Sequence, residues 1–487
     1  MAKQPIVIVW LKRDLRLTDH QALTAAVHSG YPVLICYCFE PWQQQDPHFA
    51  ARHWRLVVQS LQDLQQQLQA KQQRLWVFAC DFSQLLATLA QAFELKGLYS
   101  HREIGLANSW ARDQVVARQC HALELPWQQF WQQAVRQGSQ ARKGWQAFAQ
   151  HHWQQPLLPI PWAEMRTVTQ LPDSLTELRV KQLPKAWLRP DPSMQQGGET
   201  QAWQRWAWFV QHGLSRYRSA ISKPEQAEQY CSRMSAFLSL GNLSIRQLHQ
   251  ALAAHRVSGR KALQSRLAWH CHFMQKFESC VRMQFAPLNL GYLPLLQAQQ
   301  QQQPQAQLKA NFQAWAQGRT GYPMVDACMR SLWQTGYLNF RLRAMLVSFA
   351  CHHLALPWQW VAQHLARLFL DFEPGIHYPQ IQMQVGLTGF NTLRIYNPVQ
   401  QSLKQDPEGR FIVRYLPELA DLPPPLRHQP WTMGPLERQW YAWPLDYPEP
   451  MVDHLRTAEQ ARKRLWQWRA SLQVQRAVPE LLAQQVD

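Results

Sequence analysis

The sequence lacks long apolar runs, closely paired cysteines and a glycine-rich dinucleotide motif. No run approaches the roughly 18 apolar residues that span a bilayer, and Met1–Pro5 has no apolar signal-peptide core. The nine cysteines include no Cys-x-x-Cys pair. No G-x-G-x-x-G follows the first apolar run, which excludes an ordinary dinucleotide-binding Rossmann unit. We therefore expect a reduced, cytoplasmic chain with no membrane segment and no metal.

Tryptophan content is the unusual feature of an otherwise ordinary composition. The chain has 487 residues, long enough for two or three domains, and 46% of them are apolar and 17% charged. Its 24 tryptophans exceed what globular chains usually carry. Packing accounts for most buried tryptophans. Many of them in one fold also supply stepping stones for electron transfer.

Positive charge is concentrated toward the C-terminus. The formal net charge is +18, and over residues 200–487 Lys and Arg outnumber Asp and Glu by 30 to 17. Such an excess favours a polyanionic partner, with DNA or RNA as the obvious candidates. A solvated basic surface without a partner is the alternative interpretation.

Apolar runs rich in β-branched residues predict parallel strands in the N-terminal part. Five such runs alternate with helical patterns at 48–70, 83–95 and 109–122. The runs are Ile6–Trp10, Val33–Phe39, Leu75–Ala79, Gly97–Ser100 and Leu125–Phe130. The alternation predicts an α/β domain with a doubly wound parallel sheet over residues 1–135.

The rest of the chain divides into a connector and a helical domain. Residues 136–199 are rich in proline and glutamine and are interpreted as an inter-domain connector. Helical periodicity dominates residues 200–487, which predicts an all-α domain. Within it Gln297–Gln307 is low in complexity and contains proline, so a mobile loop is predicted there. The last twenty residues are predicted to form a helix.

Several motifs in the C-terminal third occur in a characteristic order. They are Gly318–Arg330, Asn339–Arg343, Leu370–Gly375, Arg394–Pro398, Pro407–Ile412 and Tyr415–Leu419. In this order and spacing they resemble the flavin-binding domain of the photolyase/cryptochrome superfamily. Val9–Arg16 with Asp19 resembles the first strand and turn of the same family. The resemblance covers nearly the whole chain and implies an FAD-binding helical domain.

The resemblance also carries over individual flavin-site residues. Cys231–Leu238 resembles the family's Thr-Ser-x-Leu-Ser segment, whose hydroxyls and amides hold phosphates, with Cys231 in place of the usual Thr. The implied cofactor-binding residues are Tyr217, Ser232, Arg233, Met234, Ser235, Arg341, Asp371, Glu373 and His377. A helix cap or surface ion pair is the alternative for each one alone.

Lesion-site residues depart from the family pattern. The resemblance places Trp269 against a flipped lesion and Gln401 against DNA. Arg266 stands where well-known pyrimidine-dimer repair enzymes carry Glu, and Phe340 where they have Asn. An Arg can donate to the carbonyls of a dimer but cannot accept from them. Trp269, Arg266, His377 and Phe340 are the implied catalytic residues.

The implied electron-transfer chain is altered as well. Trp315 and Trp358 align with the distal and middle members of the family's tryptophan chain, while Ile381 replaces the flavin-proximal one. Candidate substitutes are Tyr378, Trp360, Trp333 and Tyr337, and core packing is the alternative for each. The same alignment puts His377 opposite flavin N5, where an imidazole can donate or accept a proton.

The resemblance implies an enzyme that repairs pyrimidine dimers in DNA with light and reduced FAD. A cryptochrome-type photoreceptor without repair activity is the alternative, and a non-photochemical nucleic-acid-binding flavoprotein is a third class. The N-terminal domain is expected to hold an antenna chromophore of the folate or deazaflavin type, or to be purely structural. No Cys follows Cys351, which argues against the iron–sulfur branch. We expect a monomer without a signalling tail.

Overall fold

The computed structural model describes residues 3–136, 143–441 and 446–485, and it divides into two compact units. The first unit comprises Met1–Trp208, Arg233–Glu278 and Asp371–Gly375. The second comprises Phe209–Ser232, Ser279–Leu370 and Ile376–Asp487. The chain therefore passes between the units several times. The boundaries that we predicted at residues 135 and 199 stay a prediction, and residues 137–142 of the connector lie outside the described part.

The first unit contains a five-stranded parallel sheet in the order β3-β2-β1-β4-β5. All five predicted strands are present, as is the predicted α/β fold class. The strands are β1 (Pro5–Leu11), β2 (Val33–Cys38), β3 (Leu75–Phe78), β4 (Glu94–His101) and β5 (Trp127–Phe130). In register, Val9 lies beside Ile35 of β2 and Tyr99 of β4. The first strand is thus central, which places the turn that follows it at the middle of one sheet edge.

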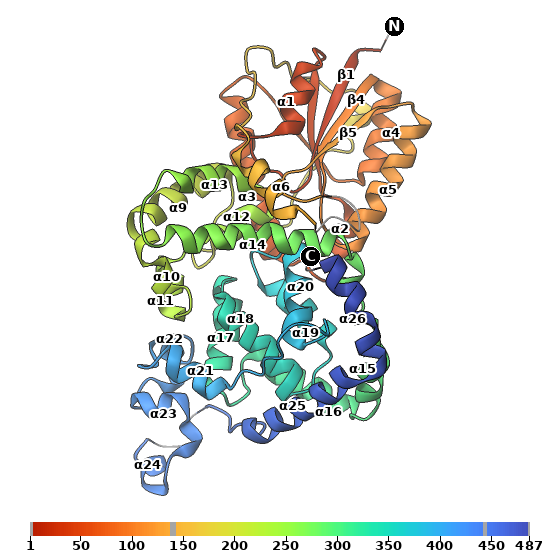
Figure 1. Ribbon diagram of the computed structural model, residues 1–487. Helices are drawn as coiled ribbons and strands as arrows, with labels where there is room; N and C mark the ends of the chain where they lie inside the picture. The colour runs from red at the N-terminus through yellow and green to blue at the C-terminus, as the bar shows by residue number, and fades with distance from the viewer. Residues whose placement is uncertain (1–2, 137–142, 442–445, 486–487) are drawn as a thin grey trace. The chain divides into compact units, whose positions relative to one another are not determined.

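Helices cover both faces of this sheet, and each face has its own apolar core (Figure 1). Val7, Val9 and Leu11 belong to a core with α1 (Gln21–His28) and α3 (Ala51–Gln69). The alternate residues of β1 belong to a second core with α4 (Phe82–Ala92) and α5 (Ala107–Ala122). Burial on both faces explains why the strands read as continuous apolar runs rather than as alternating ones.

The segment after the sheet is bound along its β3 edge. Backbone N–H of Val180 donates to the carbonyl of Val77 at 3.1 Å, and that of Ala79 donates to Leu178 at 2.9 Å. This pairing covers strand atoms that would otherwise be exposed at an edge. The unit also contains α2 (Pro41–Gln45), α6 (Trp145–Gln154), α7 (Asp173–Thr176), α8 (Lys185–Leu188), α12 (Ser235–Ser239), α13 (Ile245–Ala253) and α14 (Arg260–Glu278).

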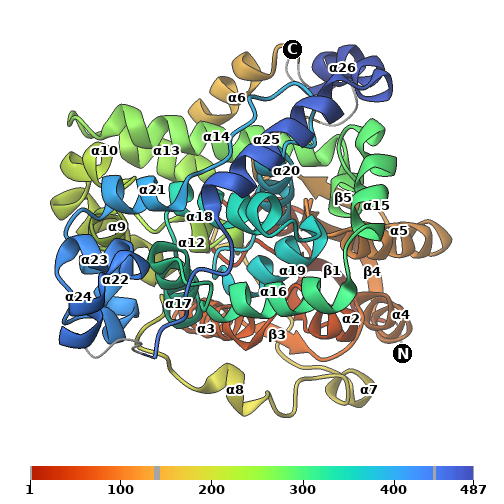
Figure 2. The ribbon, with the colours of Figure 1, turned by 90° about the horizontal axis from the view of Figure 1, so that it is seen from below.

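In the second unit the described residues form helices and connecting loops and no strand. Its centre is α17 (Pro323–Thr335), which packs against α16 (Gln305–Gln317), α18 (Phe340–Ser348), α21 (Pro398–Gln405) and α22 (Arg410–Tyr415) (Figure 2). Other helices are α10 (Tyr217–Ala220), α11 (Pro224–Tyr230), α15 (Leu293–Gln301), α19 (Trp358–Leu368), α20 (Pro374–Val385), α23 (Pro424–His428), α24 (Pro435–Trp440), α25 (His454–Ala470) and α26 (Leu472–Gln485). Helix α9 (Glu199–His212) runs across the division between the units.

One local prediction was wrong. Gln297–Gln307 forms the end of α15 and the start of α16, not a loop. Glutamine has a good helix propensity, and Pro304 stands just before α16, where a proline costs the helix no hydrogen bond. The predicted C-terminal helix is present as α26. None of the described helices combines the length and apolar character that crossing a membrane requires.

Candidate functional site

The turn after β1 is organised around the buried carboxylate of Asp14. Its Oδ2 lies 2.8 Å from Nδ1 of His101 and 3.2 Å from Nε2 of His20, and its Oδ1 accepts from the backbone N–H of Lys12. Burial opposes ionisation, but the two imidazoles outweigh it and hold the pKa of Asp14 well below its usual value. Burial lowers the pKa of His101 to about 4. Asp14 is therefore a charged acceptor, and His101 beside it is neutral.

This cluster has the composition of a metal site but not its hydrogen-bonding pattern. Asp14, His20 and His101 each offer one ligand atom within 4.8 Å of the others. However, Nδ1 of His20 accepts the backbone N–H of Leu23 at 3.0 Å. Because Nδ1 accepts, the ring proton of His20 is on Nε2, the atom that faces Asp14. A metal at Nε2 would require a proton on Nδ1, directed at the N–H of Leu23. The hydrogen bonds from His101 and Lys12 to Asp14, and from Leu23 to His20, indicate a structural role for the cluster.

Arg13, on the same turn, donates hydrogen bonds to two distant segments of the chain, the end of α12 and the segment before α20. Its Nε donates to the carbonyl of Ser239 at 2.8 Å, and one terminal nitrogen donates to the carbonyl of Phe372 at 2.7 Å. The other terminal nitrogen lies 3.5 Å from the carboxylate of Glu373. A Cβ at Gly241 would lie 2.2 Å from the carbonyl oxygen of Arg13, so only glycine permits this close approach. Arg13 thereby positions the segment that carries Asp371 and Glu373.

Glu373 is the titratable group of this segment. It is buried, and burial raises its pKa to about 7 against the opposing effect of Arg13. Asp371 and Glu103 add to the rise because their negative charges disfavour a second carboxylate nearby. At neutral pH Glu373 is consequently divided between its acid and its carboxylate forms. We did not predict the role of Arg13 from sequence, since its partners lie 226 and 359 residues away.

The predicted phosphate segment has an anion-binding backbone conformation. Arg233 has a φ of 62°, in the left-handed region, and Met234 follows with φ −72° and ψ −17°. Successive residues of opposite hand point their N–H groups to one side and form a nest for anions. Ser235 then begins α12, and the carbonyl of Arg233 is held by the amide of Gln195 at 3.1 Å. In the second unit Ser232 is buried.

Two polar groups at the start of α18 have unused hydrogen-bonding capacity. Asn339 caps the helix, with its Oδ1 accepting the N–H of Leu342 at 3.1 Å. Its buried Nδ2 has no hydrogen-bond partner among the described residues, and neither has the buried Nε of Arg341. Buried donors without partners are costly, so the pair fits a polar ligand at this position. Arg341 was a predicted flavin residue; Asn339 was not, although it stands in the same motif.

The other predicted flavin residues of the second unit are buried. Tyr217 packs edge-on against Phe209 at 5.7 Å. Nε2 of His377 lies 2.9 Å from the carbonyl of Ala362, and its ring contacts Phe369 and Tyr378. Because a carbonyl only accepts, Nε2 of His377 carries a proton and donates it to Ala362.

The tryptophans predicted for electron transfer are buried in the second unit. Trp315 and Trp358 are almost fully buried, and the indole N–H of each has no hydrogen-bond partner among the described residues. The ring centre of Phe312 lies 6.0 Å from that of Trp315 and 5.8 Å from that of Trp360. His364 lies 5.5 Å from Trp315 and 6.0 Å from Trp333, which is 50% exposed. The rings that contact one another form an aromatic cluster that reaches the surface, and its members are Phe312, Trp315, Trp333, Trp360 and His364.

Of the residues predicted to contact a lesion or DNA, Trp269, Arg266 and Phe340 are exposed and Gln401 is partly buried. On α14 the indole of Trp269 is 47% exposed, and the guanidinium of Arg266 lies 5.2 Å from its ring. Phe273 supports Trp269 edge-on at 6.0 Å. Phe340, in the second unit, begins α18 and is 45% exposed. Gln401 lies on α21, and its buried Oε1 has no partner among the described residues.

The first of the C-terminal motifs, Gly318–Arg330, has a structural role. The buried carboxylate of Asp326 accepts from Thr320, from the backbone of Gly321 and from the hydroxyl of Tyr447 at 2.6 Å. Burial raises the pKa of Asp326 to about 6, because all of these donors are neutral. The motif therefore fixes the turn before α17.

Comparisons with known proteins agree with this geometry. Residues 263–467 match the family model of the FAD-binding domain of DNA photolyase, and residues 7–151 match that of DNA photolyase. A cryptochrome DASH of Synechocystis is 28% identical over 94% of this chain and 97% of its own. A deoxyribodipyrimidine photo-lyase of Vibrio cholerae is 28% identical over 93% of this chain and 97% of its own.

Solved structures show the same fold. The Synechocystis cryptochrome superposes with a TM-score of 0.82 at 25% identity, over 95% of this chain and 99% of that chain. A class III photolyase from Agrobacterium tumefaciens also gives 0.82, at 24% identity, over 97% of this chain and 99% of its own. The protein belongs to the photolyase/cryptochrome superfamily, and its C-terminal region is an FAD-binding domain. An antenna chromophore in the N-terminal region stays a prediction.

Proposed function

We propose that the protein repairs pyrimidine dimers in DNA with blue light and FAD. The observation that carries this proposal is the exposed indole of Trp269 with Arg266 beside it on α14. An exposed large aromatic side chain next to a cation is suited to stacking a base taken out of a DNA strand. The basic excess of residues 200–487 supports a DNA partner.

Protein groups would bind and orient the two reactants. The nest at Arg233–Met234 and the unpaired donors of Asn339 and Arg341 would hold the polar parts of FAD. Trp269 would stack on the flipped pyrimidines, and Arg266 would donate to their carbonyls. The chemistry that bound FAD supplies is transfer of one electron to the dimer on excitation and its recovery after the linking bonds break, with no net oxidation.

A photoreceptor without repair activity is the second candidate. Arg266 provides a donor where a repair enzyme of the family has a carboxylate, and Ile381 is buried at the predicted flavin-proximal position. The names of the relatives are divided between cryptochrome DASH and photo-lyase at similar identity. Repair is the stronger proposal because Trp269 remains exposed and aromatic.

A repair assay separates the two functions. Oligonucleotides that contain a cyclobutane dimer or a (6-4) product would be illuminated with the reduced protein, in single- and double-stranded form, with dark samples as controls. Loss of either lesion in the light supports repair. Normal flavin bleaching with no loss of any lesion would favour the photoreceptor.

Trp269 supplies the matched variant for this assay. Trp269→Ala should reduce affinity for damaged DNA roughly tenfold or more, since stacking one base contributes about 1–3 kcal/mol. Affinity for undamaged DNA should change little, and Trp269→Phe should keep part of the stacking. Equal losses on damaged and undamaged DNA would show that Trp269 does not contact a lesion.

A further inference from the structure

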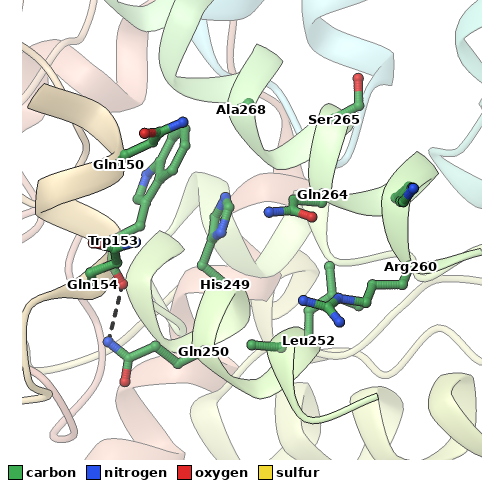
Figure 3. A pocket seen from close by; sticks show the side chains of 12 residues that line it. Gln150, Trp153, Gln154, His249, Gln250, Leu252, Arg260, Gln264, Ser265 and Ala268 are labelled. Atoms are coloured by element: carbon green, nitrogen blue, oxygen red, sulfur yellow. Dashed lines mark hydrogen bonds between the residues drawn. The ribbon is translucent and has the colours of Figure 1, made fainter. Parts of the chain in front are cut away.

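A pocket of about 790 Å³ opens within the first unit, between α6, α13 and the start of α14 (Figure 3). This volume lies within the range of small-molecule sites in proteins. Its lining residues are polar or basic for the most part: Gln150, Trp153, Gln154, His249, Gln250, Leu252, Ala253, Arg260, Lys261, Gln264, Ser265 and Ala268. None of them is a residue that we placed in the flavin site.

A stacked aromatic pair forms one wall of the pocket. The rings of Trp153 and His249 are 4.1 Å apart and nearly parallel, with an interplanar angle of 9°. Trp145 packs edge-on against Trp153, and the amide of Gln250 donates to the carbonyls of Trp153 and Gln155. The wall is thus fixed by contacts between α6 and α13, so a ligand would meet it preformed.

His249 presents a ring face to this space. In Figure 3 its imidazole lies between Trp153 and the side chain of Gln264. The Nε2 atom is buried and has no hydrogen-bond partner among the described residues. Burial lowers the pKa of His249 to about 4, so the ring is neutral at physiological pH. A neutral imidazole can stack on a planar heterocycle without repelling a cation beside it.

The charges of the lining select an anion. Arg260 and Lys261 contribute two cations, and no Asp or Glu is among the lining residues. Both stand in the first turn of α14, a helix of 19 residues, where the macrodipole adds to the positive potential. Arg binds phosphate through paired hydrogen bonds, while the amides of Gln150 and Gln264 offer donors and acceptors suited to the edge of a base.

Most of the pocket residues on α14 lie on a different face from Trp269. Successive residues of a helix are about 100° apart, so Lys261, Gln264 and Ala268 share one face. By the same spacing Arg266 and Trp269 lie roughly 130° around the helix from them. Ser265, which also lines the pocket, is one turn before Trp269 and forms the rim between the two faces. A base stacked on Trp269 would therefore lie beside this rim and not on the face of Lys261, Gln264 and Ala268.

We propose that this pocket binds a nucleoside monophosphate, with the base on His249 and the phosphate on Arg260 and Lys261. The nucleotide is either free or one unit of a DNA strand. The site is additional to the flavin and lesion sites and requires no light. It stands on the geometry of the pocket and does not depend on repair activity.

The test measures binding of dAMP to the FAD-loaded protein in the dark by calorimetry. We expect binding that Arg260→Gln/Lys261→Gln weakens at least tenfold and that His249→Ala weakens roughly tenfold. Arg256→Gln is the matched control, because Arg256 is exposed on the loop before α14 but does not line the pocket. Retained flavin absorbance verifies that each variant is folded.

Competition with the single strand (dA)8 identifies the source of the nucleotide. Displacement of dAMP by the strand, lost in Arg260→Gln/Lys261→Gln, would assign the pocket to DNA. Binding of dAMP without displacement would assign it to free nucleotides. Absence of dAMP binding at millimolar concentration, equal binding by the double variant, or binding of a folate in its place would overturn the proposal.

Discussion

The turn after β1 and the start of α18 both bury charged side chains of the family motifs, but they satisfy them differently. In the turn Asp14 accepts from His101 and a backbone N–H and lies 3.2 Å from Nε2 of His20, and Arg13 donates to two carbonyls. At the start of α18, Nε of Arg341 and Nδ2 of Asn339 have no partner among the described residues. Buried polar groups are normally paired. The polar groups of the turn therefore pair with one another, whereas the start of α18 has donors that a polar ligand would satisfy.

Removal of Asp14 should break the self-contained turn and cause the largest loss of stability. Asp14→Asn replaces a carboxylate with an amide whose N–H group would face another donor. A hydrogen bond to a charged group contributes about 1.5–3 kcal/mol, and Asp14 accepts one from His101 and one from the backbone of Lys12. Urea unfolding at pH 7, followed by circular dichroism, measures the difference from the unmodified protein. A change of less than about 1 kcal/mol would show that the cluster contributes little.

Asp326 is the comparison for Asp14, because it is a buried carboxylate whose donors do not include an imidazole. Its pKa is raised, whereas that of Asp14 is lowered. Asp326→Asn should cost about 1–3 kcal/mol, because one oxygen no longer accepts from Gly321 and Tyr447. The folded pKa of about 6 exceeds the unfolded value near 3.8, so stability from the protonated acid is present below the unfolded pKa and is lost as pH rises through 6. The variant should lose more at pH 5 than at pH 7.5. A pH-independent difference would contradict the raised pKa.

Glu373 is a carboxylate that contacts the turn through Arg13. Arg13 lowers the pKa of Glu373, but by less than burial raises it. Its folded pKa of about 7 lies above the ordinary 4.5, so its contribution to stability falls as pH rises from 4.5 through 7. Glu373→Gln, which stays neutral, should therefore gain about 1–3 kcal/mol relative to the unmodified protein between pH 5 and pH 8. Unfolding free energies at both pH values measure this shift. A constant difference would place the pKa outside this interval.

Arg341 tests whether the unpaired donors at the start of α18 bind FAD. Arg341→Ala should weaken FAD binding roughly tenfold or more and change the stability of the flavin-free protein by less than about 1 kcal/mol. Arg343→Ala is the matched control on the same helix, because its Nε donates to the carbonyl of Leu338 at 2.7 Å. The control should destabilise the flavin-free protein more. Equal effects of both variants on stability would show that Arg341 is a structural residue.

The aromatic cluster should give the smallest effect, on a rate alone. Trp315→Phe should slow light-driven bleaching of the flavin several-fold if the contacts through Phe312 and His364 conduct electrons. Trp440→Phe is the control, since this indole is 84% exposed on α24. Absorption after a blue flash follows both variants. Unchanged bleaching in Trp315→Phe would show that electrons take another route.

Sequence patterns predicted the helices and strands, because secondary structure depends largely on residues that are close along the chain. Continuous apolar runs marked all five strands, since both faces of the sheet are buried. Motif order identified the FAD-binding domain. The pattern failed at Gln297–Gln307, where low complexity suggested a loop although glutamine is compatible with a helix.

Tertiary structure alone decided which polar groups meet. Arg13 reaches the carbonyl of Phe372 across 359 residues, and Asp14 pairs with His101 across 87. No periodicity encodes such partners, because they depend on how distant segments pack. The same packing left Arg341 and Asn339 with unpaired atoms and gave the pocket beside His249 its stacked wall. The sequence by itself determined the fold and the family of this protein. Which buried polar groups find a partner within the chain, and which do not, was decided by how distant segments pack in space.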